Sequence, residues 1–338
     1  MDTAVHGVIV PHPYCVAVLT RPDGLPDERV AGALAAGWGL AVDGLAHAPV
    51  GFGSHHWRAT AGADRWFVTV DDVARAGAAG RLAAALATAR RLCDAGLGFV
   101  VAPVATRTGA VLHRVGAVWA VSLFPHVEGA THPWGAYPGR AERLAVLDLV
   151  ARLHRSPAAL RAGAVADDLA LPERDGLDAA VAGRAPAGEP GPFAAPARDL
   201  LAARAGAVRG ALGRYDDLAA AVLARPDRLV LTHGEPHRGN TISTAAGPVL
   251  VDWDTALVAP PERDLWSMTA EDARIPADYE QRTGIAPDPD ALAFYRLRWG
   301  LTDISLYVAW FRRPHGDTAD TRLAWEGLQA SVGPRLEG

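Results

Sequence analysis

The hydrophobic pattern of the chain changes near Pro125. Before Pro125, short apolar runs alternate with glycine-bearing turns, as in antiparallel strands, and after it long apolar patterns of helical period prevail. A length of 338 residues is enough for about two domains. We therefore predict an α+β fold with two lobes, a small β-rich N-lobe at residues 1–123 and a larger helical C-lobe at residues 124–338.

The β-rich part is expected to form a sheet of about five strands with a helix packed on it. A tight turn at Gly51–Gly53 separates the first two strands of a predicted hairpin. Residues 80–95 carry leucines and alanines at helical spacing and end at Gly96, and a second helix is expected at 26–40. The strand ranges are 48–50, 55–60, 66–70, 99–104 and 118–123.

The helical part contains one region of strand-like pattern. At 229–253, three short apolar runs bracket a loop that is rich in polar and charged side chains. Residues 184–197 are rich in proline and glycine and are expected to form a surface loop. The helices are expected at about 139–155, 195–223, 289–312 and 318–332.

The chain contains no lysine, and its 33 cationic side chains are all arginine. This excludes Schiff-base chemistry, a Walker A phosphate-binding lysine and a Ser-x-x-Lys nucleophile. The formal net charge of −5 and the absence of a basic run make nucleic acid a poor candidate for the main partner. A small molecule is therefore the first expectation for the substrate.

No feature of the sequence points to a membrane partner. The N-terminal region lacks the basic segment of a signal peptide, and no apolar run has transmembrane length. The two cysteines, Cys15 and Cys93, are too few for a disulfide framework and are expected to be small buried hydrophobic residues. We therefore expect a cytoplasmic protein.

The loop in the strand-like region carries the residues that phosphoryl transfer requires. Four residues separate Glu235 from Asn240, and Asp252 follows Asn240 at the end of the apolar run 249–251. In the kinase-like catalytic segment, which this pattern resembles, a carboxylate orients the hydroxyl nucleophile, and an amide and a strand-end aspartate hold magnesium against the phosphates. Hard oxygen ligands of these types suit magnesium.

Each of these residues also has a simpler explanation. An Asp-x-Asp sequence such as Asp252 and Asp254 is usually a turn, and His233 with His237 has the i, i+4 spacing of zinc ligands. The proline and glycine within 233–240 exclude the helix that such a zinc site would use. The order of all the polar residues together, between a β-rich and a helical part, favours the catalytic interpretation.

The strings VDWDTALVAPPERDLW at 251–266 and FYRLRWGLTDISLYVAWF at 294–311 resemble the aminoglycoside phosphotransferase family, most closely its spectinomycin phosphotransferase branch. The resemblance implies a two-lobed protein-kinase-like fold. It also implies that Asn240 and Asp252 are metal ligands and catalytic residues, that Asp254 is an additional ligand, and that Glu235 occupies the position of the catalytic base. Asp264 would tie the loop down.

The same resemblance implies a nucleotide site between the lobes. Residues 122–125 would form the hinge, and the backbone of Ser122, Leu123 and Phe124 would face the purine of ATP or GTP. The loop with Gly51, Gly53 and Ser54 would cover the phosphates. The cofactors implied are Mg²⁺ and ATP or GTP.

The chain departs from the family pattern at several charged positions. Glu235 replaces the usual aspartate, and Thr69 stands where the phosphate-binding lysine of the strand is expected. The helix at 80–95 has no glutamate to pair with such a lysine. We expect Arg58 to supply the missing cation, with His55 and His56 as weaker candidates.

Aromatic and acidic residues of the helical part are expected to bind the acceptor. Such a mixture suits a cationic, polyhydroxylated ligand, although a stripe such as Trp299, Asp303 and Tyr307 at helical spacing is more often part of a core. The candidates are Trp266, Glu271, Asp272, Trp299 and Asp303, with Tyr279, Glu280 and Tyr307 as further members.

These observations predict a magnesium-dependent phosphotransferase that moves the γ-phosphate of a nucleoside triphosphate to a hydroxyl of a cationic small molecule. An aminoglycoside or aminocyclitol antibiotic is one candidate acceptor. Two alternatives stay open. Glu235 and Thr69 would suit a nucleotide-binding pseudokinase, and a Ser/Thr peptide kinase of natural-product biosynthesis would have a broad acidic groove.

Overall fold

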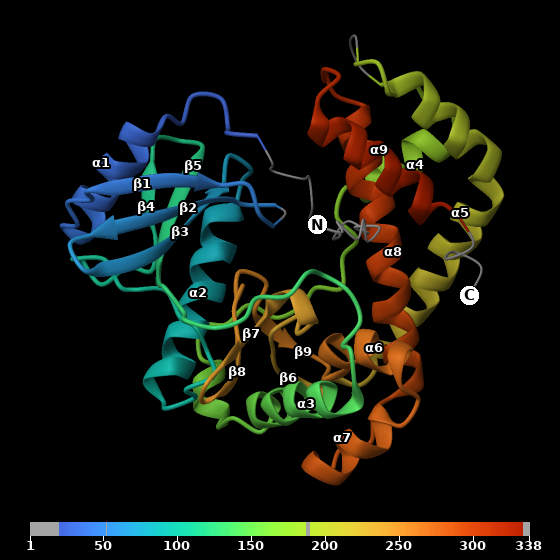
Figure 1. Ribbon diagram of the computed structural model, residues 1–338. Coiled ribbons are helices and arrows are strands. Elements are labelled where there is room, and N and C mark those ends of the chain that lie inside the picture. Colours follow the sequence, from blue (N-terminus) through green and yellow to red (C-terminus); the bar gives the residue numbers. More distant parts are fainter. Residues whose placement is uncertain (1–19, 52, 187–189, 334–338) are drawn as a thin grey trace, which may run out of the picture.

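The computed structural model describes residues 20–51, 53–186 and 190–333. Within these ranges the chain forms a small lobe built on an antiparallel sheet and a larger, mostly helical lobe (Figure 1). The predicted α+β architecture is therefore confirmed. Cys15 lies outside the described residues, and Cys93 is a free, partly buried thiol.

The N-lobe sheet has five strands in the order β1-β2-β3-β5-β4, with every neighbouring pair antiparallel. The tight hairpin between β2 and β3 turns at residues 62–63, between the strands predicted at 55–60 and 66–70. The bounds are β1 Gly44–Ala48, β2 His55–Ala61, β3 Asp64–Asp72, β4 His113–Val115 and β5 Trp119–Pro125.

Two helices, α1 (Asp27–Trp38) and α2 (Ala78–Asp94), pack on opposite faces of this sheet. Val30 and Leu34 of α1 are in the same core as the strand residues that point to that face, among them Val68. Because successive strand residues point to opposite faces, Thr69 and Asp71 point away from α1. The face of the sheet that carries Thr69 and Asp71 also lies towards the C-lobe, because Asp71 interacts electrostatically with Asp254 there.

The expected strand at residues 99–104 is absent, and this prediction is wrong. The segment forms a single parallel bridge between Val100 and Leu250, with the Leu250 amide donating to the Phe99 carbonyl at 2.7 Å. Farther along, the Val104 amide donates to the carbonyl of Leu123 in β5 at 2.7 Å. The apolar segment therefore joins the N-lobe sheet to a strand of the C-lobe, and the fifth strand is β4 instead.

The C-lobe confirms the four long helices that the sequence predicts, each within a few residues. Within the described residues it adds three shorter α-helices and one strand, β9, that were not predicted. The helices are α3 Arg140–His154, α4 Arg174–Val181, α5 Ala194–Leu223, α6 Glu262–Glu271, α7 Ile275–Thr283, α8 Pro289–Phe311 and α9 Ala319–Ser331. The strands are β6 Val230–Thr232, β7 Thr241–Thr244, β8 Gly247–Leu250 and β9 Leu257–Ala259.

Helix α8 lies at the centre of the largest core, between α5 and α9 (Figure 1). The tilted rings of Phe294 of α8 and Tyr215 of α5 pack with their centroids 5.0 Å apart, and the Tyr215 hydroxyl donates to the Leu169 carbonyl. The two short strand pairs, β6–β9 and β7–β8, lie beside α3 and α6. They carry the loop that holds the candidate catalytic residues.

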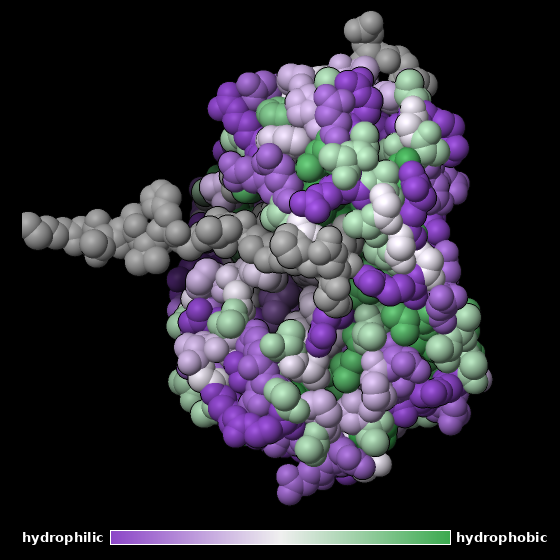
Figure 2. Space-filling model, turned by 90° about the vertical axis from the view of Figure 1, so that its right-hand side faces the viewer, coloured by the Kyte–Doolittle hydropathy of each residue, from purple (hydrophilic) through white to green (hydrophobic). Residues whose placement is uncertain are grey.

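Hydrophilic residues cover much of the face shown in Figure 2, with hydrophobic residues scattered among them. Among the described residues, the exposed large hydrophobic side chains are Val50, Val118, Val165 and Leu223. No helix in the described part of the chain is both long and apolar enough to cross a membrane.

Candidate active site

Asp264 of α6 anchors the start of the catalytic loop. Its carboxylate accepts the backbone amides of His233 at 2.9 Å and Gly234 at 2.6 Å, and it lies 3.0 Å from His154 Nε2. Burial opposes ionisation, but the hydrogen bond from His154 and nearby positive charge hold the pKa of Asp264 below its ordinary value. The expected role of Asp264 in tying down the loop agrees with this geometry.

Arg263, which the sequence analysis did not single out, braces the other side of the loop. Its guanidinium donates to Thr232 Oγ1 and to the Thr255 carbonyl, both at 2.9 Å. Gly234 has φ +104°, and a Cβ there would lie 2.4 Å from the Arg263 guanidinium. Glycine is therefore required at this position. Only the charged string at 262–264 could have pointed to Arg263.

Glu235 is 6% exposed and lies among other carboxylates. Burial, followed by the charges of Asp252 and Asp254, raises the pKa of Glu235 well above its ordinary value, while Arg263 lowers it. The charge of Asp303 on α8 acts in the same raising direction. The structure thus brings the candidate base to the candidate metal ligands and to one candidate acceptor residue.

Asn240 and Asp252 are held together by the backbone. The Val251 amide donates to the Asn240 carbonyl at 3.0 Å, and the Asn240 side-chain amide donates to the Glu235 carbonyl at 3.2 Å. Asp252 has φ +67°, in the left-handed region that non-glycine residues seldom adopt. Such backbone strain is often found at functional sites.

Asp252 and Asp254 interact closely. Burial first, and then the charge of Asp254, raise the pKa of Asp252, and burial also raises that of Asp254. Trp253 between them is fully buried and donates from Nε1 to the Leu250 carbonyl at 2.9 Å, which fixes the turn.

These side chains fit a magnesium ion by the chemistry of their donors. No group of three His, Cys, Asp or Glu side chains gathers as a metal cluster anywhere in residues 20–51, 53–186 and 190–333. A site here would therefore consist of two carboxylates, the Asn240 amide oxygen and oxygen atoms of a nucleotide or water. Magnesium is bound in this way, by few protein ligands together with phosphates.

Cross-strand pairing in the N-lobe sheet places the residues that were predicted to bind the nucleotide in rows across the strands. Arg58, Phe67 and Phe124 form one cross-strand row, and His56, Thr69 and Ser122 form the next. Beyond them, Ser54 Oγ donates to Asp71 Oδ1 at 2.5 Å. The charge of Asp71 acts on Asp252, and the charge of Asp254 acts on Asp71. The Ser54 end of this face therefore lies nearest the C-lobe carboxylates.

Thr69 pairs with a histidine where a lysine was expected. Its hydroxyl lies 3.3 Å from His56 Nδ1, and burial lowers the pKa of His56 to about 4, so the ring is neutral at pH 7. His56 lies against the glycine turn, because a Cβ on Gly51 would be 3.0 Å from its Nε2. This row is therefore polar but uncharged.

Two residues that were predicted to contact the nucleotide, Arg58 and Leu123, have the following surroundings. Arg58 is exposed at the Phe124 end of the face, where its charge contributes to lowering the pKa of His126 after burial and Arg65. This places Arg58 two rows away from Asp71. Leu123 points into the α1 core and its carbonyl accepts the Val104 amide, so that carbonyl is already used.

The structure separates the predicted acceptor residues into two groups. Trp266 of α6 and Trp299 of α8 have ring centroids 5.0 Å apart, and α8 also carries Asp303. Glu271 and Asp272 instead form ion pairs with α3, at 2.8 Å to Arg143 and 2.5 Å to Arg140. We therefore leave this second pair out of the proposed acceptor site. Tyr279 and Tyr307 are buried.

Comparison with known proteins identifies the family. The model of the phosphotransferase enzyme family APH matches residues 47–295. Protein StrN of Streptomyces griseus is 36% identical over 254 residues, which cover 70% of this chain and 72% of StrN. The chain belongs to the phosphotransferase enzyme family. The resemblance that the sequence suggested is confirmed.

Solved structures show the same fold at low sequence identity. Spectinomycin phosphotransferase APH(9)-Ia, in complex with ADP and spectinomycin, has a TM-score of 0.70 at 15% identity, covering 92% of this chain and 96% of that one. A microcompartment-associated aminopropanol kinase has a TM-score of 0.61 at 16% identity, with the same coverage. Amicoumacin kinase hAmiN has a TM-score of 0.58 at 13% identity, covering 93% and 94%. The kinase-like fold is confirmed, and the family match makes the protein a phosphotransferase.

Proposed function

We propose that this phosphotransferase moves the γ-phosphoryl group of ATP or GTP, with magnesium, to a hydroxyl of a cationic small molecule. The observation that carries the proposal is the position of Glu235. Its carboxylate lies under the electrostatic influence of Asp252 and Asp254 on one side and of Asp303 on the acceptor helix on the other. One carboxyl group thus interacts electrostatically with the proposed metal ligands and with the proposed acceptor site.

Each residue of the loop has a defined task in this reaction. Asn240, Asp252 and Asp254 would hold Mg²⁺, which supplies charge neutralisation to the phosphates when it is bound. Glu235 orients the acceptor hydroxyl and takes its proton at the carboxylate. Arg263 favours the ionised form of Glu235, which a proton acceptor needs.

The nucleotide would lie under the inner face of the N-lobe sheet. Phe67 and Phe124 offer aromatic surface at the Arg58 end, which suits a purine, and Ser122 lies in the neighbouring row. The backbone of Gly51, Gly53 and Ser54 would approach the phosphates. No lysine takes part, so the phosphate charge would be balanced chiefly by the metal and backbone amides.

The acceptor would lie between α6 and α8. Trp266 and Trp299 provide adjacent aromatic rings, and Asp303 adds negative charge beside Glu235. Aromatic and acidic groups together favour a ligand with ammonium and hydroxyl groups. Similar proteins named for spectinomycin and aminopropanol support an aminocyclitol, aminoglycoside or smaller amino alcohol.

Calorimetric titration of ATP with and without Mg²⁺ tests the metal and nucleotide site. In Asp252→Ala, we expect the gain in affinity that Mg²⁺ provides to fall at least about tenfold, because a carboxylate ligand is lost. Asp217→Ala removes an exposed aspartate of α5 and serves as the matched control, with no expected change. An unaltered Mg²⁺ effect in Asp252→Ala contradicts the proposal.

A nucleotide-binding pseudokinase is the second candidate. The neutral pair of His56 and Thr69 favours it, since this row lacks the cation that many kinases use to hold phosphates. Both candidates predict nucleotide binding. Phosphate transfer that depends on Glu235 separates them.

A further inference from the structure

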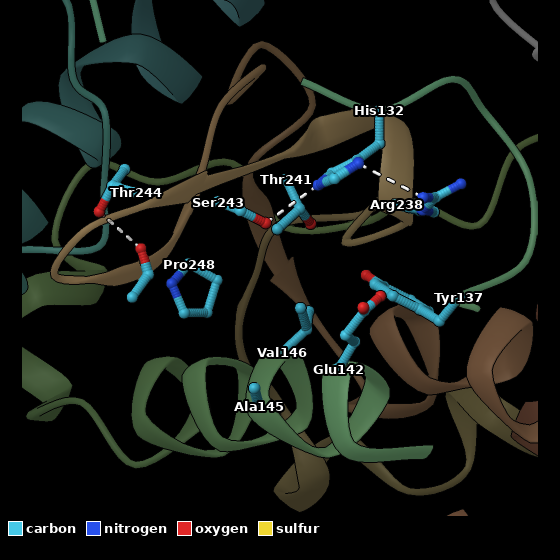
Figure 3. Close-up of a pocket in the computed structure, with 11 residues that line it drawn as sticks. His132, Tyr137, Glu142, Ala145, Val146, Arg238, Thr241, Ser243, Thr244 and Pro248 are labelled. Carbon is cyan, nitrogen blue, oxygen red and sulfur yellow. Dashed lines mark hydrogen bonds between the residues drawn. The ribbon is translucent and has the colours of Figure 1, made fainter. Parts of the chain in front are cut away.

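A second pocket lies on the C-lobe, apart from the proposed active site. It has a volume of about 220 Å³ and opens between α3, the segment that precedes α3, and the β7–β8 hairpin (Figure 3). The lining residues are His132, Tyr137, Glu142, Ala145, Val146, Arg238, Thr241, Ser243, Thr244, Gly247 and Pro248. None of these belongs to the proposed catalytic, metal, nucleotide or acceptor residues.

The catalytic loop forms one wall of this pocket. The Tyr137 hydroxyl donates to the Pro236 carbonyl at 2.8 Å, and the Thr241 hydroxyl donates to the His237 carbonyl at 3.1 Å. Arg238 of the loop itself lines the pocket. A ligand bound here would therefore touch the loop between Glu235 and Asn240 without entering the interlobe site.

Arg238 brings an unbalanced positive charge to the pocket. Within the described ranges its guanidinium forms no ion pair with a carboxylate, and its Nε is shielded from solvent without a hydrogen-bond acceptor. Its Nη2 lies 3.4 Å from His132 Nδ1. His132 Nε2 lies 2.9 Å from Ser243 Oγ, so the ring can accept from Arg238 and donate to Ser243 in its neutral form.

Glu142 brings a negative charge to another wall. It is an exposed residue in the first turn of α3, and its side chain makes no hydrogen bond or ion pair with any residue that the structure describes. In Figure 3 it rises from α3 towards the Tyr137 side chain, while Arg238 and His132 lie on the upper side of the same space. Ala145, Val146 and Pro248 supply the apolar part of the lining.

We propose that this pocket binds a small zwitterionic molecule, with its anionic group at Arg238 and its ammonium group at Glu142. A guanidinium with free N–H groups binds carboxylate or phosphate oxygens strongly, especially where solvent is partly excluded. Glu142 attracts the ammonium group, and the apolar lining contacts the short carbon chain between the two charges. The Ser243 hydroxyl is available to the anionic group.

Calorimetric titration with three probes tests the charge pattern. O-phosphoethanolamine carries both charges, inorganic phosphate only the anion, and ethanolamine only the ammonium. We expect the zwitterion to bind at least about fivefold more tightly than either single-charge probe, since both walls then contribute. Absence of binding by all three at millimolar concentration, or equal affinity of the zwitterion and phosphate, overturns the proposal.

Variants locate the probe. Arg238→Gln and Glu142→Gln should each weaken binding of O-phosphoethanolamine at least about fivefold, whereas exposed Arg209→Gln and Glu326→Gln are matched controls without effect. Thermal melts verify that each variant is folded. Asp252→Ala should bind the probe as the wild type does. If Asp252→Ala weakens binding of the probe, the probe lies between the lobes and the proposal is refuted. Unchanged binding in Arg238→Gln would likewise refute binding in this pocket.

Discussion

Ser54 of the glycine turn donates a hydrogen bond of 2.5 Å to Asp71 of β3. The bond joins the turn over the proposed phosphate site to the sheet, two residues beyond Thr69. Burial, with the charge of Asp254, raises the pKa of Asp71 to about 7, although the bond from Ser54 opposes this rise. This chain thus has Thr69 at the lysine position and, two residues farther along β3, a carboxyl group that resists ionisation.

Asp71 makes the stability of the metal-free protein depend on pH. Its folded pKa of about 7 lies above the ordinary 3.8, so the folded state binds more protons between these values and loses stability as pH rises. Asp71→Asn keeps an acceptor oxygen for Ser54 and removes this dependence. At pH 8 we expect the variant to be more stable by about 1 kcal/mol or more.

Urea unfolding at pH 4 and pH 8, with chelator present, measures this effect. The advantage of Asp71→Asn over the wild type should be small at pH 4 and largest at pH 8. Asp64→Asn, an exposed aspartate of the same strand, should show no such trend. A difference that does not change with pH contradicts the assignment.

Gly234 and Arg263 form a close contact that a larger residue would disrupt. Gly234→Ala adds a Cβ about 2.4 Å from the guanidinium at a positive φ, so it must displace Arg263 from Thr232 and Thr255. We expect a loss of about 2–4 kcal/mol in the free energy of unfolding. Gly206→Ala in α5, where nothing lies within 4 Å, should instead add about 0.5–1 kcal/mol. Chemical denaturation of both variants checks the contrast, and equal effects would refute it.

The position of Arg58 predicts which part of the nucleotide it can affect. Because Arg58 lies in the row of Phe67 and Phe124, two rows from Asp71, its removal should alter adenosine and ATP binding to the same extent. Calorimetry on Arg58→Gln gives the ratio of the two affinities, which we expect to match the wild type. A selective loss of ATP affinity would put Arg58 on the phosphates, as the sequence alone suggested.

Local patterns were sufficient for most of the fold. Helical spacing predicted α5 and α8, and two β-rich runs on either side of a small-residue turn predicted the β2–β3 hairpin. The segment 99–104 was mistaken for a strand. It instead forms one parallel bridge to Leu250 and one backbone hydrogen bond to Leu123. An apolar run indicates that the segment is buried, and tertiary contacts determine whether it forms a strand.

The loop residues of the site were visible because their chemistry and spacing are local. Glu235, Asn240 and Asp252 lie within one short segment, whereas charge pairing across the fold cannot be read from sequence. Glu271 and Asp272 have the chemistry of acceptor ligands but are held by arginines of α3, some 130 positions earlier. The role of Arg263 was missed for the same reason.

Glu235 is proposed to be a working catalytic base, in a site that accommodates its longer side chain. Replacing it with aspartate would draw the carboxylate back by roughly an ångström, and a shift of that size can cost about a hundredfold when catalysis depends on positioning. Replacing it with glutamine removes the proton acceptor while keeping the shape.

The direct measurement is mass spectrometry of phosphate gain by a panel of aminocyclitols, aminoglycosides and amino alcohols, incubated with ATP or GTP and Mg²⁺. The wild type should transfer phosphate to at least one acceptor, Glu235→Gln should show no transfer with nucleotide affinity retained, and Glu235→Asp should be slower by about a hundredfold. If the wild type transfers nothing and Glu235→Asp gains activity, the protein is a degraded kinase and the proposed function is wrong.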